Sequence, residues 1–398
     1  MNKQQYVFFM LLVALFSLLT YFHDVVKEAA ESPFNDFGNY WVNANILRYG
    51  ANPWDCKTVD PLIVKQAEEN HLTLLDAPFH SLGYFVFVLP FSMLPFRCAA
   101  LAWLAVGHIL LFFAVWLLLK AASGKRGFSW EDVFTVVFLV FAFWPIREQL
   151  HDGQPNFFIL FLLSLCLFFL KKERYLWAGI SLGVGIQFRE YLGLLILFFL
   201  LKKNYRILAG ILIGIVSLKA LAVGLFGFDK ELSYWRHIIG LFGKRAHFTM
   251  ANQSLAAAIC RIGKDMMGVA VCRVIGLFLS LIFIGKAVFN TRKKGNDLSG
   301  VALFLSLCFL VSAWVHESHY VALYPAIIVA WFQLQNKSSW LLRGCFMLSY
   351  LFLGLKYSFI RFPQFHSGPL AFFSAVKVWG VILLFFVLGR LTCFAYED

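Results

Sequence analysis

Residues 98–119 read CAALAWLAVGHILLFFAVWLLL, an unbroken apolar run long enough to cross a membrane as a helix. In hydrocarbon only helices and closed barrels satisfy their backbone hydrogen bonds, and this run is too long and too uniformly apolar for a barrel strand. Similar runs, some of them short, recur at 6–21, 82–96, 131–146, 157–170, 176–188, 190–201, 206–225, 268–289, 298–315, 319–335, 339–356 and 370–394. The sequence therefore predicts an all-α, polytopic helical membrane protein.

The composition supports the same fold class. Of the 398 residues 60% are hydrophobic and 14% are charged, whereas soluble domains are usually about a quarter charged. The net charge of +13 comes largely from short basic clusters between apolar runs, at 171–172, 202–203 and 292–294. Such clusters are typical of cytoplasmic loops, so a nucleic-acid partner is not expected.

We expect one integral membrane domain over residues 1–398. Its parts are a retained first span at 1–22, an external loop at 23–81, core spans at 82–225, a second external or re-entrant stretch at 226–267, and C-terminal spans at 268–398. Residues 40–47 indicate a short amphipathic helix along the membrane surface. Residues 176–201 read as a short helical hairpin with a charged tip.

Ionisable groups at membrane depth are costly and are therefore functional candidates. Asp36 lies among aromatic residues such as Tyr40 in the first loop. Its carboxylate could act as a general base on a sugar hydroxyl, with the rings stacking on sugar faces. The alternative is an aspartate that caps an interfacial helix beside a belt of aromatic residues.

Two further polar segments allow two interpretations each. Residues 147–156, which include Gln154 and Asn156, predict a tight polar external turn that either holds a ligand's hydroxyls or phosphate or simply caps the next helix. Arg189, at the hairpin tip, could neutralise a phosphate in a low-dielectric site. Alternatively Arg189 pairs with its neighbour Glu190, although adjacent helical residues do not face each other well.

His316 and His319 flank Glu317 between two apolar runs. They could bind a metal, or position and protonate a reacting group, or lie in an interfacial loop without function. The spacing His-Glu-x-x-His is absent, so a zinc site is not expected. The chain also lacks a paired-aspartate motif for a nucleotide sugar, a phosphate-binding loop and a dinucleotide fingerprint, so we expect neither a metal nor a cofactor.

Taken in order, several short motifs resemble glycosyltransferase family 87, whose members are polyprenol-phosphate-mannose-dependent mannosyltransferases of the GT-C superfamily. The motifs are Asp36-Phe37, Gly50-Ala51-Asn52-Pro53, Gly153-Gln154-Pro155-Asn156, Ala178-Gly179 leading to Arg189, Asn252-Gln253-Ser254-Leu255, and Ser312-Ala313-Trp314 with His316 and His319. The resemblance covers most of the chain up to about residue 325.

The resemblance implies a GT-C-like bundle and assigns roles. Asp36 would be the catalytic base, His319, or else His316, a catalytic histidine, and Arg189 the donor-phosphate ligand. Substrate would be bound by Tyr40, Gln154, Asn156, Asn252 and Gln253. The chain departs from the family pattern at Arg189-Glu190-Tyr191, where Lys-Pro is usual, and at Pro78-Phe79-His80, where paired prolines are usual. Both departures concern the identity of the sugar that the protein binds.

The sequence thus predicts an inverting glycosyltransferase that moves a hexose, first of all mannose, from a polyprenyl-phosphate-linked donor to a lipid or glycan acceptor. We expect it among the lipids of a bacterial plasma membrane, with its active site on the non-cytoplasmic face. The alternatives are a transporter or flippase for a glycolipid or anionic solute, and a transferase for another lipid-linked sugar.

Overall fold

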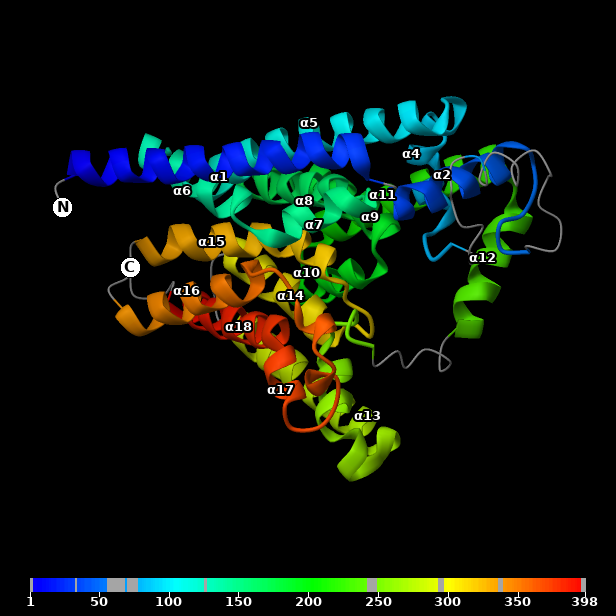
Figure 1. Cartoon of the computed structure of the whole chain (residues 1–398). Helices are drawn as coiled ribbons and strands as arrows, with labels where there is room; N and C mark the ends of the chain where they lie inside the picture. Colours follow the sequence, from blue (N-terminus) through cyan, green and yellow to red (C-terminus); the bar gives the residue numbers. More distant parts are fainter. Residues whose placement is uncertain are drawn as a thin grey trace.

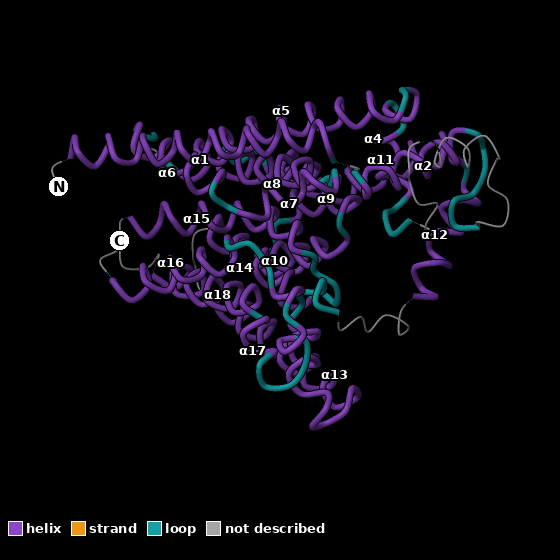
Figure 2. The backbone as a smooth tube through the Cα atoms, viewed as in Figure 1, coloured by secondary structure: helices purple, strands orange, loops and turns teal. Residues whose placement is uncertain are grey.

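The computed structural model describes residues 3–32, 34–55, 69, 78–124, 127–241, 249–292, 297–335 and 339–394. Within these ranges the chain is helical and has no strand (Figure 2). The α-helices are α1 (Lys3–Glu31), α2 (Asn35–Arg48), α4 (Leu82–Val88), α5 (Phe96–Ala122), α6 (Trp130–Phe141), α7 (Trp144–Asp152), α8 (Asn156–Lys171), α9 (Tyr175–Phe188), α10 (Leu195–Leu201), α11 (Tyr205–Phe226), α12 (Phe228–Leu241), α13 (Leu255–Arg292), α14 (Asp297–Val311), α15 (Tyr324–Gln335), α16 (Trp340–Gly354), α17 (Ala371–Ser374) and α18 (Val376–Phe394). The 3-10 turns are η1 (Phe91–Met93), η3 (Glu190–Leu194), η4 (Glu317–Leu323), η5 (Phe359–Arg361) and η6 (Pro363–Phe365).

Among the described residues, five helices are long and apolar enough to cross a membrane. They are Gln4–Glu31, Phe96–Ala122, Tyr205–Phe226, Asp265–Arg292 and Val376–Cys393, and the bent pair α6 and α7, at 48°, makes a possible sixth span. Large apolar side chains cover the outer surfaces of these helices; on α1, for example, Phe16 is 70% exposed. Lipid is the environment that such a surface requires, and the predicted polytopic helical fold is confirmed.

The bundle is built from neighbouring helices that pack in pairs (Figure 1). α1 packs on α6, α5 on α8, α8 on α9, and α9 closely on α11, while α14 and α16 each pack on α18 on the C-terminal side. Glycines allow the closest pair to approach: a Cβ at Gly214 of α11 would lie 2.6 Å from the Ile180 carbonyl oxygen of α9. Small residues are used in this way where two membrane helices touch.

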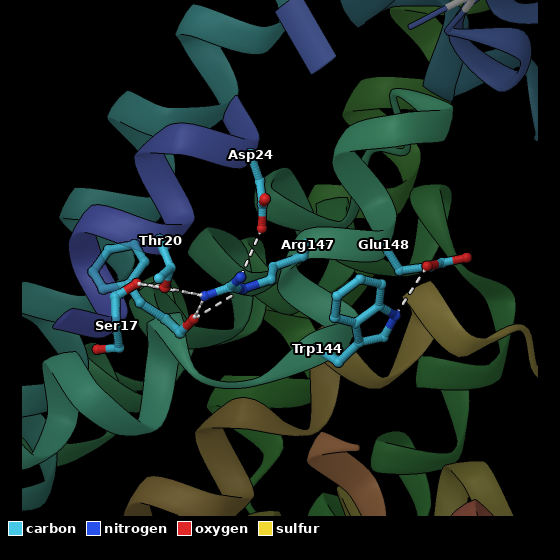
Figure 3. A network of polar contacts seen from close by, with 7 residues as sticks. Ser17, Thr20, Asp24, Trp144, Arg147 and Glu148 are labelled. Carbon is cyan, nitrogen blue, oxygen red and sulfur yellow. Dashed lines mark hydrogen bonds and ion pairs between the residues drawn. The ribbon is translucent and has the colours of Figure 1, made fainter. Parts of the chain in front are cut away.

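Residues 147–156 differ from the predicted turn, because most of them belong to helix α7. Arg147 ties this helix to α1: it donates to Asp24 at 2.6 Å and to Thr20 Oγ1 at 2.7 Å (Figure 3). Within α7 itself, Trp144 Nε1 donates to Glu148 at 3.0 Å. Arg147 is therefore used to hold α7 in place, and only residues 153–155 form the turn into α8.

Several predicted boundaries shift. Helix α1 continues to Glu31, past the predicted end of the first span at residue 22. Residues 40–47 are helical as expected, but all of them are buried. This part of α2 is therefore surrounded by protein and does not form the amphipathic surface helix that the sequence predicted. Most of the first loop that follows, at 56–77, lies outside the described residues. In the second polar stretch lies α12, and α13 breaks at Gly268 (φ 77°), where the next span was expected to begin.

The short apolar run at 82–96 does not form a full span. Helix α4 has seven residues, which is about 10 Å of rise, and η1 and Pro95 separate it from α5. The predicted hairpin at 176–201 is divided at its tip as expected: α9 ends at Phe188, and the chain resumes as η3 and α10.

Candidate active site

Residues from several separate parts of the chain line one cavity of about 570 Å³. Ligand pockets for small molecules are usually of this size. Six of the nine side chains predicted to form the site lie on its wall, and they come from both halves of the chain. The lining residues are Asp36, Asn39, Tyr40, Pro78, Phe79, His80, Asp152, Gln154, Arg189, Glu190, Tyr191, Ile238, Ser312, Ala313, Trp314, His316 and His319.

A hydrogen-bonded chain crosses the cavity wall. Gln154 Nε2 donates to the Asp36 carboxylate, and Arg189 Nη2 donates to Gln154 Oε1 at 2.7 Å. The Tyr40 hydroxyl donates to the same Gln154 oxygen at 3.4 Å. A carboxylate and a guanidinium thus share one side-chain amide, which fixes the position of each relative to the other.

The start of α2 is fastened to the end of α7. Ser32 Oγ donates to the His151 carbonyl at 2.5 Å. Gly153 ends α7 in the left-handed region (φ 69°), and a Cβ there would lie 2.6 Å from Phe37 Cβ. Glycine adopts that conformation without strain and leaves room for Phe37. This close approach brings the first turn of α2 against the turn that carries Gln154.

Arg189 occupies the break between α9 and η3, where its backbone is extended (φ −148°, ψ 107°). It does not pair with Glu190, contrary to one of the two predicted alternatives: Glu190 accepts a hydrogen bond from the Tyr234 hydroxyl of α12 at 2.7 Å. The Nε of Arg189 is buried and has no hydrogen-bond partner in the part of the chain that the structure describes. The guanidinium therefore has donor capacity left over beside the cavity.

His316 and His319 lie at the start of η4 with ring centroids 6.1 Å apart. The His316 backbone N–H donates to His319 Nδ1 at 3.2 Å. Burial lowers the pKa of His316, and burial together with Arg189 lowers the pKa of His319 well below its usual value. Both rings are therefore neutral at pH 7. Because Nδ1 of His319 accepts a hydrogen bond, its proton is on Nε2.

The Asp36 carboxyl is strongly influenced by its surroundings. Burial raises the pKa of Asp36, whereas the His316 ring, the hydrogen bond from Gln154 and the Arg189 guanidinium act in the opposite direction. Asp36 does not cap α2 through its side chain, since the helix begins without a side-chain cap. A carboxylate with a raised pKa is suited to accept a proton near neutral pH.

The other three predicted site residues do not line the cavity. Asn156 is fully buried at the start of α8, and within the described ranges both of its side-chain polar atoms lack hydrogen-bond partners. Asn252 and Gln253 support the histidine segment instead. Asn252 Nδ2 donates to the Ala313 carbonyl at 3.0 Å, and its Oδ1 accepts from the Val315 backbone N–H at 3.1 Å. Asn252 therefore has a structural role, and contact of these three side chains with sugar stays a prediction.

A buried ion pair supports the same segment from the other side. Lys377 of α18 lies 2.8 Å from Glu317, and the two side chains are 0% and 8% exposed. Glu317 also accepts a hydrogen bond from the Tyr357 backbone N–H at 3.1 Å, and Lys377 donates to the Leu353 carbonyl at 2.8 Å. The C-terminal helices thereby hold the start of η4.

Two residues of the cavity wall, His80 and Asp152, were not among the site residues predicted from the sequence. His80 is 5% exposed, and its ring lies 4.2 Å from that of Tyr84 and 4.9 Å from that of Tyr40, between centroids. Asp152 contributes a second carboxylate to the cavity. In the sequence, Asp152 could have been identified from its position in the polar segment 147–156, and His80 from its position where the family has paired prolines.

Among the described residues, no three His, Cys, Asp or Glu side chains cluster closely enough to hold a metal ion.

Comparison with known proteins identifies the family. A model of glycosyltransferase family 87 matches residues 80–315, which is more than half of the 398-residue chain. A search of curated proteins gives no match. Gln154 and Arg189 lie inside the matched range, whereas Asp36 and His319 lie outside it and are connected to it through the cavity. The family predicted from the motifs is confirmed: the chain belongs to glycosyltransferase family 87 and is a multi-pass membrane glycosyltransferase.

Proposed function

We propose that this glycosyltransferase moves a hexose, specifically mannose, from a polyprenyl-phosphate-linked donor to a lipid or glycan acceptor, with inversion at the anomeric carbon. The observation that carries the proposal is that Asp36, Gln154 and Arg189 form one hydrogen-bonded chain on a cavity wall. A base and a phosphate-binding cation are the two groups that such a transfer needs. The family membership favours the transferase over the transporter that the sequence left open.

In the proposed reaction Asp36 accepts the proton of the acceptor hydroxyl. The hydroxyl oxygen attacks the anomeric carbon from the face opposite the lipid phosphate and forms the new glycosidic bond. The bond between that carbon and the phosphate oxygen breaks, and the lipid phosphate leaves with the electron pair. Burial raises the pKa of Asp36, which brings it closer to the pH at which a general base works best.

Arg189 is proposed to stabilise the departing phosphate. One of its nitrogens is held by Gln154, and its Nε has no partner among the described residues. A guanidinium matches the geometry of phosphate oxygens with paired N–H groups. The negative charge on the leaving phosphate grows as the bond breaks, so this contact is strongest in the transition state.

His319 and Tyr40 are proposed to orient the substrates. The neutral His319 ring, with its proton on Nε2, can donate to a phosphate oxygen or an acceptor hydroxyl, and His316 supports it through the hydrogen bond from its backbone. Tyr40 presents a ring to the cavity while its hydroxyl is held by Gln154. An aromatic face of this kind suits the apolar side of a sugar ring.

The proposed site lies on the non-cytoplasmic face of a bacterial plasma membrane. Helix α8 begins two residues after Gln154 and ends at Lys171, and α9 ends immediately before Arg189. The 16 residues of α8 rise by about 24 Å, so the basic loop at 171–172 lies far from the cavity along the helix axis. Basic loops favour the cytoplasm, which puts the opposite helix ends outside.

The choice of mannose follows the family resemblance, and the chain's departures from the family pattern bear directly on it. Arg189-Glu190-Tyr191 and Pro78-Phe79-His80 all line the cavity. A transfer assay with the purified protein and a membrane lipid extract tests the choice. Radiolabelled polyprenyl-phosphate-mannose should give labelled product, and the matched glucosyl donor and GDP-mannose should not. Transfer from the glucosyl donor alone would refute mannose, and transfer from GDP-mannose alone would refute the lipid-linked donor.

A further inference from the structure

Helices α13 and α18 enclose a second groove of about 410 Å³ whose accessible surface is almost entirely apolar. Phe283 and Phe289 of α13 and Phe385 and Phe386 of α18 line it. It shares no lining residue with the cavity that holds Asp36. Both helices are long and apolar enough to cross a membrane, so we expect the groove to lie at the level of the hydrocarbon region.

The two helices run in the same direction along the groove. The Phe283 and Phe385 rings lie 5.3 Å apart, and farther along the two helices Cys393 Sγ lies 3.8 Å from Asn290 Oδ1. At this second contact Gly389 allows close approach, since a Cβ there would lie 2.8 Å from the Asn290 amide nitrogen. The C-terminal ends of both helices therefore lie on the same side.

Two cations, Lys286 and Arg390, line this groove. They lie over the rings of Phe289 and Phe386, at 5.6 and 5.5 Å from the ring centroids. Neither makes an ion pair with any carboxylate in the part of the chain that the structure describes, and no carboxylate lines the groove. The groove is thus apolar along its length, with two positive charges that no lining side chain neutralises.

We propose that this groove binds an anionic phospholipid, with an acyl chain between the phenylalanines and the phosphate of its headgroup at Lys286 and Arg390. An uncompensated charge at membrane depth is costly, and a lipid phosphate would compensate it. Helix α13 ends at Arg292 beside the basic cluster 292–294, which predicts the cytoplasmic side. Basic pockets between membrane helices on that side are suited to acidic headgroups.

Native mass spectrometry of the full-length protein tests the proposal, with phosphatidylglycerol and phosphatidylcholine of identical acyl chains as probes. The wild type should retain phosphatidylglycerol in preference to phosphatidylcholine. The variant Lys286→Gln/Arg390→Gln should bind phosphatidylglycerol roughly 30-fold more weakly, from the usual contribution of two basic residues near a membrane surface. Ile282→Trp, which fills the groove without changing the charge, should weaken binding of the same lipid.

The matched control is Lys171→Gln/Lys172→Gln, which removes the same charge from two exposed residues at the end of α8. It should leave phosphatidylglycerol retention unchanged. Equal retention of the two lipids by the wild type would overturn the proposal. So would equal losses in the groove variant and the control, because the attraction would then be a general effect of surface charge. Displacement of phosphatidylglycerol by equimolar polyprenyl phosphate would likewise overturn it in favour of a different amphiphile.

Discussion

The Asp36 carboxylate and the Arg189 guanidinium are joined by a single side-chain amide, that of Gln154, rather than by a direct ion pair. In a direct ion pair the carboxylate and the guanidinium would neutralise each other. The bridge instead keeps the carboxylate and the cation apart on one wall of the cavity, so each remains available to a different part of a substrate. The proposed chemistry requires this separation, because the acceptor hydroxyl and the departing phosphate lie on opposite sides of the anomeric carbon.

Replacement of Arg189 should separate the contribution of charge from that of geometry. Arg189→Gln should lower kcat by about 100- to 1000-fold, because it removes a charge that acts on the leaving phosphate. Arg189→Lys should lose less, since it keeps the charge without the planar fork. The measurement is kcat in the transfer assay, with Arg206→Gln at an exposed arginine of α11 as the control. An Arg189→Gln enzyme within threefold of wild type would remove this residue from the mechanism.

Gly153→Ala should damage the site more than Gly50→Ala. Both glycines have positive φ, 69° and 79°, so alanine carries a similar backbone strain of about 1–2 kcal/mol at each. At Gly153 a Cβ would meet the Phe37 Cβ at 2.6 Å, whereas at Gly50 it would meet none of the described residues within 4 Å. Thermal unfolding should show the larger loss of Tm for Gly153→Ala, with a fall in kcat that Gly50→Ala lacks. Equal effects would mean that the contact between α2 and α7 is not tight.

The buried pair Glu317 and Lys377 should be essential for stability. Lys377→Met leaves a buried carboxylate without its partner and should cost about 3–5 kcal/mol of unfolding free energy. The pair of Asp229 and Lys230 provides the control, because its carboxylate is 70% exposed and Asp229→Asn should cost about 1 kcal/mol or less. Tm measured in detergent compares the two. A Lys377→Met protein as stable as Asp229→Asn would show that Lys377 does not hold η4.

The pH dependence of kcat/KM should reflect Asp36. The base must be ionised, so activity should fall as the pH drops through its pKa. Burial raises that pKa above the value near 3.9 of an exposed aspartate. The acid limb of the activity profile should therefore lie above this value, and an acid limb at or below pH 4 would contradict the account.

The effect of Asp36 on protein stability has the opposite sign. Because its pKa is raised in the folded state, its contribution to stability is fully present below the unfolded pKa and declines as the pH rises through the folded pKa. Asp36→Asn should remove that decline in Tm.

Much of the fold could be predicted from residue patterns, and six of the nine predicted site residues line the cavity. Long apolar runs specify membrane helices because the bilayer leaves few alternatives. Asp36 and Arg189 were identifiable because a charge at membrane depth is rare. Their common cavity could be expected only from the order of the motifs in the family, since the two positions are distant in the sequence.

A short motif does not reveal which way its side chains point. Asn252 and Asn156 belong to recognisable motifs, yet one binds the backbone at 313–315 and the other is fully buried. The polar segment at 147–156 looked like a turn because Arg147 and Glu148 are charged. In the folded chain Arg147 is satisfied by Asp24 of α1, a partner that the local sequence could not indicate.

The most direct test of the central claim is the turnover of Asp36→Asn measured together with donor binding. Asparagine keeps the shape of the side chain but cannot accept the acceptor's proton. With polyprenyl-phosphate-mannose as donor, kcat should fall by about 100- to 10,000-fold, while the Kd of the donor stays within about threefold of wild type. If Asp36→Asn transfers sugar at a rate within a few-fold of wild type while binding the donor normally, Asp36 is not the base and the proposed mechanism is wrong.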